Sequence, residues 1–370
     1  MKGISRRQLC QFSLAGGALV SMPGCGVISP HKNLQPGVEP PDLRAGAIGL
    51  PRGGFAIRAI NPGGEAVWQC PVNTRCHSGC RNPGTGDLVF VERRPGWAFH
   101  VLDAATGQRH RRIEAGKGEH FVGHGVFAPD GQTLYLPASR YEQGEGIIAV
   151  YDVLQGYRRS RTLELDGVGP HELKMHPDGR TLVVGLGGIL THPDYDRIKL
   201  NLDTMEPALL LMDRFSGDIL IRFSPSHHQL SCRHLDVTPA GDIYAAYQYQ
   251  GPLYETPPLV ARYRKGQFTE IDFGTDVLRS LGNYIASIVT HPENALVAVT
   301  SPVGGTAVIF DGLSGKVQNT ASLSDCAGIQ ALKGGDFLMS TGQGKLMQFG
   351  ASGAPRELAS QAVQWDHHLV

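Results

Sequence analysis

The chain has 370 residues, in which 34 lysines and arginines balance 34 aspartates and glutamates, so the charge gives no basis for binding nucleic acid or an anionic membrane. Its 48 glycines and 24 prolines argue against a helical bundle, because both residues destabilise helix interiors. Apolar residues, at 41%, suffice for a buried core, and the length exceeds that of one small domain.

Residues 1–25 have the features of an export signal. Lys2, Arg6 and Arg7 precede an apolar stretch over 12–22, and residues 1–25 contain no aspartate or glutamate. Residues 5–9, Ser-Arg-Arg-Gln-Leu, fit the twin-arginine pattern. The apolar stretch is shorter than the roughly 20 residues that a membrane-spanning helix needs. We therefore expect export of the folded protein to the periplasm.

The segment after the signal is expected to be a flexible tether over residues 26–43. Residues 22–25, Met-Pro-Gly-Cys, resemble a lipidation motif, so Cys25 is either removed or lipidated. A lipid on Cys25 would be the chain's one means of membrane attachment. Residues 44–370 are then expected to form one domain, acting as a monomer.

Turn signals recur along this domain and predict its architecture. An aspartate stands four residues before a glycine at 103–107, 152–156, 213–217 and 311–315. A second, mostly proline-initiated turn recurs six times from residue 83 at intervals of 41 to 62 residues. Short apolar strands lie between these turns, and such a period is typical of a β-propeller. We predict an all-β, seven-bladed β-propeller in which residues 44–72 and 361–370 share the closing blade. Two separate β-sandwiches are the alternative, which the even spacing disfavours.

One repeat carries an insertion between Gly185 and Pro207. Long insertions in compact repeats are usually functional or disordered. This one contains apolar residues at 198, 200, 202 and 205, so we expect an ordered lid. Its polar candidates for a site are His192, Asn201 and Asp203.

Histidines occupy one position in four of the six repeats, just before the second turn. They are His77, His124, His171 and His234, and the closing segment adds His368. Equivalent repeat positions lie at equivalent places around the ring, here at the start of the innermost strand. Converging neutral imidazoles favour transition metals, so we predict a metal site for iron or copper. The alternative is that these histidines only form hydrogen bonds between neighbouring blades.

Charged residues flank these histidines. Glu172 and Asp366 are candidate ligands or acceptors that fix histidine tautomers. Arg75 and Arg233 favour an anion or a carboxylate. Two further histidines, His176 and His291, directly precede turn prolines and are assigned to surface turns.

The cysteines and the known enzyme motifs do not identify a function. Five of the seven cysteines lie beyond residue 25, and this odd number leaves at least one unpaired within the chain. Cys76 and Cys80 have no second pair at zinc-ribbon spacing. The sequence contains no G-x-S-x-G elbow, no phosphate-binding loop, no H-E-x-x-H and no C-x-x-C-H motif.

Several separated motifs resemble one exported bacterial family, domain-of-unknown-function family 1513. The matching segments are Arg-Arg-Pro-Gly at 93–96, the stretch 121–127 around His124, Pro-His-Glu at 170–172, the insertion end at 199–205, Arg-His-Leu at 233–235, residues 248–252 and Trp-Asp at 365–366. The resemblance covers roughly residues 44–370. It implies a twin-arginine-exported seven-bladed propeller of unestablished activity, often encoded beside imelysin-type iron-uptake proteins. His368 matches a family position, whereas His367 stands where the family has an amide, and Cys76 also departs from the family pattern.

Three functions remain open from the sequence. The first is a periplasmic binding or accessory protein for iron or another transition metal, with its site at one mouth of the channel. The second is a metal-dependent enzyme at the same mouth, a lactonase-like hydrolase or an oxidoreductase. The third is a scaffold that binds partner proteins of an iron-uptake system.

Overall fold

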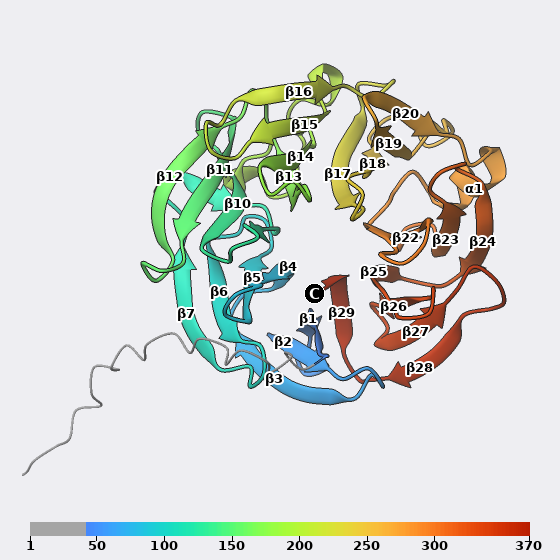
Figure 1. Ribbon diagram of the computed structural model, residues 1–370, viewed down its shortest axis with the longest axis horizontal. Coiled ribbons are helices and arrows are strands. Elements are labelled where there is room, and N and C mark those ends of the chain that lie inside the picture. Colours follow the sequence, from blue (N-terminus) through green and yellow to red (C-terminus); the bar gives the residue numbers. More distant parts are fainter. Residues whose placement is uncertain (1–41) are drawn as a thin grey trace, which may run out of the picture. The chain divides into compact units, whose positions relative to one another are not determined.

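The computed structural model describes residues 42–370, so the predicted signal and most of the predicted tether lie outside the described residues. Seven sheets are arranged in a ring around a central axis (Figure 1). This confirms the seven-bladed propeller. No helix within residues 42–370 combines the length and the apolar character needed to cross a membrane.

We number the blades in chain order and give their strands from the centre outwards. Blade 1 contains β29 (Gln364–Leu369), β1 (Arg44–Gly49), β2 (Phe55–Ile60) and β3 (Ala66–Val72). Blade 2 contains β4 (Cys76–Arg81), β5 (Asp87–Glu92), β6 (Ala98–Asp103) and β7 (Arg109–Glu114). Blade 3 contains β8 (Glu119–Phe121) and β9 (Val126–Phe127), then β10 (Thr133–Arg140), β11 (Glu145–Asp152) and β12 (Arg158–Glu164).

The remaining blades follow the same order. Blade 4 contains β13 (Pro170–Met175), β14 (Thr181–Leu186), β15 (Ala208–Asp213) and β16 (Ile219–Phe223). Blade 5 contains β17 (Leu230–Val237), β18 (Ile243–Tyr249), β19 (Val260–Arg264) and β20 (Gln267–Ile271). Blade 6 contains β21 (Ser287–Thr290), β22 (Leu296–Ser301), β23 (Thr306–Asp311) and β24 (Val317–Ser322), and it is preceded by helix α1 (Thr275–Ser280). Blade 7 contains β25 (Cys326–Ala331), β26 (Phe337–Thr341), β27 (Lys345–Phe349) and β28 (Arg356–Ser360).

The two ends of the domain close the ring in blade 1. Strand β1 pairs antiparallel with β29, and Ile48 lies opposite Trp365 in this register. The shared blade was predicted from the sequence and is confirmed. This pairing gives the inner edge of β1 a hydrogen-bonded partner, so that edge is not left open.

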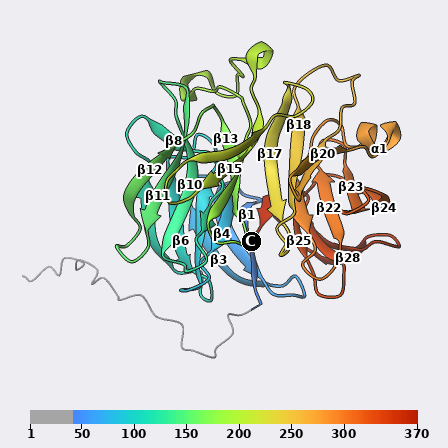
Figure 2. The same ribbon diagram turned by 45° about the horizontal axis from the view of Figure 1, so that its top comes forward.

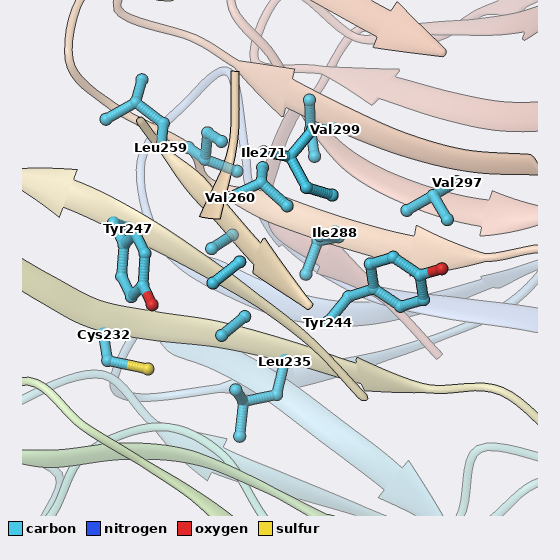
Figure 3. Close-up of a cluster of buried hydrophobic side chains, with 14 of the residues drawn as sticks. Cys232, Leu235, Tyr244, Tyr247, Leu259, Val260, Ile271, Ile288, Val297 and Val299 are labelled. Atoms are coloured by element: carbon cyan, nitrogen blue, oxygen red, sulfur yellow. The ribbon is translucent and has the colours of Figure 1, made fainter. Parts of the chain in front are cut away.

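The blades are held together by apolar layers between neighbouring sheets. Figure 3 shows one such layer, in which Tyr244 of blade 5 lies near Ile288 and Val297 of blade 6. The Tyr244 hydroxyl also donates a hydrogen bond of 2.9 Å to the carbonyl of Gly312 in the neighbouring blade. These contacts hold blade 5 against blade 6.

Irregular pairing marks the innermost strands at the histidine positions. The pairing of β4 with β5 shifts register between Cys76 and Ser78, on either side of His77, and that of β13 with β14 shifts between Pro170 and Leu173. Strand β17 shifts between Cys232 and His234. Such bulges reorient side chains and occur often beside functional sites.

Blade 3 uses a break instead of a bulge. Its innermost strand is divided into β8 and β9, and His124 lies in the gap between Gly123 and Gly125. Gly123 has a φ of +109°, and a Cβ there would lie 2.6 Å from Cδ2 of His77. Glycine is therefore needed at 123 to bring the two imidazoles together.

The insertion between β14 and β15 is an ordered segment with two short 3₁₀ turns, η1 (Pro193–Tyr195) and η2 (Leu202–Thr204). It projects above the blades as the yellow-green segment of Figure 2. The Asn201 side chain accepts a hydrogen bond from the Leu190 amide at 2.7 Å and donates one to the Gly188 carbonyl at 2.9 Å. These bonds connect the two ends of the insertion.

Candidate metal centre

Five imidazoles from five blades meet on the axis. Their ring centroids lie 4.6 Å apart for His124 and His368, 4.8 Å for His124 and His171, and 5.0 Å for both His77 with His124 and His171 with His234. All five side chains are buried. We call this set, His77, His124, His171, His234 and His368, the histidine cluster.

Three cluster members have an Nδ1 atom beside an oxygen from another blade. Nδ1 of His77 is 3.2 Å from Oδ1 of Asp366, and Nδ1 of His234 is 3.2 Å from Oε2 of Glu172. Nδ1 of His368 is 3.0 Å from the hydroxyl of Ser287. A partner at one ring nitrogen orients the imidazole and leaves the other nitrogen for a ligand.

The opposite nitrogens of two members have no partner. Nε2 of His124 and Nε2 of His368 are buried and form no hydrogen bond with any described residue. A buried polar atom without a partner is costly. Two sets of three histidines bring their nitrogens within 4.8 Å of one another: His77, His124 and His368, and His124, His171 and His234. His77, Asp366 and His367 form a third set of the same kind.

Burial keeps these imidazoles neutral. Desolvation lowers the pKa of His124 to about 3, and it holds the pKa values of His77, His171 and His368 well below their usual range. The neighbouring histidines add to this lowering. Neutral imidazole is the form that binds metal ions.

Glu172 remains a carboxylate within this buried site. Burial alone would raise its pKa, but the Lys174 ammonium, 3.2 Å from Oε1, and the histidines hold its pKa well below the usual range. Its Oε2 also accepts a hydrogen bond from the Leu235 amide at 3.2 Å. Lys174 was not identified as a site residue from the sequence. Its position two residues beyond Glu172 on β13, on the same face of the strand, could have indicated it.

Both interpretations of the histidines describe part of this arrangement. Bonds between blades do form, through Asp366, Glu172 and Ser287. The oxygens in these bonds, however, belong to side chains and not to the backbone. The five rings also face one another across the axis, and hydrogen bonds between blades do not by themselves require this convergence.

Two cavities adjoin the histidine cluster on different sides. The first, of about 220 Å³, is lined by His77, His171, His234 and His367 together with the insertion. The second, of about 310 Å³, is lined by His124 and His368 and by residues further along the innermost strands. The cluster therefore separates the two cavities.

The first cavity is strongly basic, and we call it the cationic cavity. Arg93 and Arg94 from the β5–β6 loop line it, with Arg197 and Lys199 from the insertion and Arg233 from β17. Burial and the nearby Arg94 guanidinium lower the pKa of Arg233 to about 10. Of these five cations, the sequence identified Arg233 as a site residue. The other four cations lie in loops that join the second and third strands of their blades, and this shared position could have identified them.

The other predicted site residues occupy supporting positions. Arg75, the second predicted cation, forms an ion pair with Asp366. His192 contacts Tyr141 at 5.2 Å between ring centroids, Asn201 connects the ends of the insertion, and Asp203 is exposed in η2. The insertion reaches the cationic cavity instead through Ile189, Thr191, Arg197 and Lys199.

Two other sequence assignments are resolved by the structure. The surface-turn assignment of His291 is wrong: its side chain is buried, and its Nε2 lies 2.8 Å from the Leu332 carbonyl of blade 7. All five cysteines within residues 42–370 are free thiols. Burial raises the pKa of Cys232 to about 12 and that of Cys326 to about 11, which keeps these thiols protonated.

Comparisons with known proteins give a family and a fold. Residues 70–370 match the family model described as "Protein of unknown function (DUF1513)". No curated protein matches the chain. A chain of Kuenenia stuttgartiensis hydrazine synthase is similar in structure, with a TM-score of 0.54 and 18% identity, over 69% of this chain and 70% of that one. At this identity the likeness concerns the fold alone.

Proposed function

This chain belongs to the DUF1513 family, and we propose that it is an exported protein that binds a transition-metal ion through the histidine cluster. The observation that carries the proposal is the pair of buried, unpartnered Nε2 atoms of His124 and His368. A metal ion between them would supply the missing partner. Each also belongs to a set of three histidines with closely spaced nitrogens.

The donor set favours some metals over others. Imidazole nitrogen suits copper, zinc, nickel and iron, and divalent copper binds most tightly in the Irving–Williams order. The set of His77, Asp366 and His367 has the two-histidine, one-carboxylate composition used by non-haem iron. Asp366 is already paired with Arg75 and Arg93, so the two sets of three histidines are the freer ligands. Copper is therefore the first candidate, and iron, which the family resemblance favours, is the second.

An enzymatic role is a second candidate, because the cationic cavity opens directly on three of the cluster histidines. A metal held by the cluster would face a space of about 220 Å³ in which a small molecule could sit. A bound metal there could polarise a carbonyl or phosphoryl oxygen or activate water. Turnover of a small substrate that depends on the metal would distinguish this role from binding alone.

The proposal also includes a location and a class of partner. The twin-arginine pattern at residues 5–9 supports delivery to the periplasm after folding, and Cys25 offers a site for lipid attachment there. The family resemblance supports a partner among iron-uptake proteins.

The test is metal analysis of the full chain, produced with its own signal in a host with twin-arginine export and purified from the periplasm. We expect stoichiometric copper or iron in the wild type and none in the His124→Ala, His234→Ala double variant. His110→Ala is the matched control, because His110 is exposed on β7. A metal-free wild type that takes up neither Cu²⁺ nor Fe²⁺ on addition would refute the proposal.

A further inference from the structure

Four of the five cations that line the cationic cavity form no ion pair with any residue of 42–370. Its lining includes five cationic side chains and no aspartate or glutamate. We propose that this cavity is a binding site for a small oxyanion with at least two negative charges, a di- or tricarboxylate or a phosphate. Binding of this anion does not require the metal.

The first support is the lack of ion pairs. Arg93 alone among the five contacts a carboxylate, with its NH1 atom 3.4 Å from Oδ1 of Asp366. Within residues 42–370, Arg94, Arg197, Arg233 and Lys199 form no ion pair. Lys199 donates a hydrogen bond to the neutral side chain of Gln250. The positive charges that line one cavity repel one another, and a bound anion would offset this repulsion.

The second support is a buried donor. Nε of Arg233 is shielded from solvent and has no hydrogen-bond acceptor among the described residues. Leaving a charged donor unpaired in a buried place is expensive, so such groups are normally paired. Arg233 lines the cavity, where a bound anion would provide the acceptor.

The third support is the geometry and size of the site. The cations come from three separate segments, the β5–β6 loop, the insertion and β17, so an anion would be contacted from several directions. Guanidinium groups match carboxylate and phosphate oxygens with paired hydrogen bonds. The volume of about 220 Å³ lies below the roughly 300–1,000 Å³ of pockets for drug-sized ligands, which restricts the ligand to a small molecule.

The experiment is isothermal titration calorimetry on the metal-free full chain at low ionic strength, with citrate and inorganic phosphate as separate probes. We expect one of the two to bind with one-to-one stoichiometry and to bind more weakly as salt is added. The better probe identifies the chemical class. In the Arg94→Gln, Lys199→Gln double variant, binding should weaken by about 10- to 100-fold, because charge-assisted hydrogen bonds are lost.

Two further variants keep the test decisive. Lys199→Gln alone changes an exposed side chain and should weaken binding without affecting folding. Arg158→Gln on β12 removes an exposed cation that forms no ion pair with any residue of 42–370, and it should leave binding unchanged. Absence of binding by both probes, or equal affinity in the wild type and the double variant, would overturn the proposal. Because the protein is metal-free throughout, anion binding can succeed even where the metal proposal fails, and the reverse also holds.

Discussion

Oε2 of Glu172 lies 3.2 Å from Nδ1 of His234, so that blade 4 supplies the acceptor for an imidazole of blade 5. The other oxygen of Glu172 is 3.7 Å from Nδ1 of His124. That distance is too long for a hydrogen bond, so the carboxylate orients His234 directly and only lies beside His124. Such partners make a metal-binding histidine more basic and hold its ring in place.

The first prediction concerns this carboxylate. Glu172→Gln keeps the shape of the side chain but removes the charge, and it should weaken metal affinity by about 10- to 100-fold, the usual effect of losing such a partner. Competition with a chromophoric chelator measures the change. Glu114→Gln on the exposed side of β7 is the control and should bind as the wild type does. Unchanged affinity in the Glu172 variant would exclude this orienting role.

The second prediction concerns pH. In the folded, metal-free protein the pKa of His124 is lowered to about 3 and those of His77, His171 and His368 lie well below 6.5. In the unfolded chain these histidines take up protons below about pH 6.5. The unfolded state then binds more protons, so the free energy of unfolding should fall as pH falls from about 6.5, by up to about 1.4 kcal/mol per pH unit for each histidine.

Urea unfolding at pH 7.5, 6.0 and 5.0 measures this dependence. Burial also lowers the pKa of His234. The His124→Ala, His234→Ala variant should therefore lose less stability over the same range, because two of the responsible groups are gone. An equal pH dependence in both proteins would contradict the assignment. Since the cluster stays neutral when folded, metal binding should also persist below pH 6.5, where free imidazole is already protonated.

The third prediction concerns ring closure. Trp365 of β29 is buried against Gly46 of β1, and Trp365→Ala should cost about 3–5 kcal/mol of folding stability. Trp97→Ala is the control, because this side chain is 41% exposed and should cost about 1 kcal/mol through its aromatic contacts. Thermal or urea unfolding measures both. Similar losses for the two tryptophans would argue against closure through β29 as a main source of stability.

The fourth prediction concerns the insertion. Asn201→Ala removes the two hydrogen bonds to residues 188 and 190, and each bond contributes about 0.5–1.5 kcal/mol. Hydrogen exchange at the Leu190 amide should accelerate while the melting temperature changes little. Asp203→Ala, an exposed neighbour on η2, should leave this exchange rate unchanged. If both variants exchange at the wild-type rate, Asn201 does not hold the insertion in place.

The fifth prediction concerns export. Replacing Arg6 and Arg7 by lysine should leave the protein in the cytoplasm, because the twin-arginine system recognises the arginine pair. Cell fractionation measures its location, and Arg52→Lys in the exposed β1–β2 turn is the control. Periplasmic accumulation of the Arg6, Arg7 variant would show that another route exports the protein.

The sequence alone determined the propeller, its closing blade and the convergence of the five histidines. All three depend on repetition: a residue at one place in each repeat occupies one place around the ring, so His77 and His234 could be related without knowledge of their contacts. The burial of His291 escaped the same reasoning, because it depends on packing against Leu332 of another blade.

The tertiary structure decided what surrounds the histidines. Ser287 reaches His368 across 81 positions of the sequence, and Arg94 and Arg197 meet at one cavity although they lie in different repeats. Arg94 and Arg197 both lie in loops between the second and third strands of their blades, but these loops differ in length, so the repeat alone does not show that they meet at one cavity. They come together because the blades close into a ring and the insertion folds over one end of it. The sequence therefore determined which residues face the axis, and the folded ring decided which acceptors and cations lie beside them.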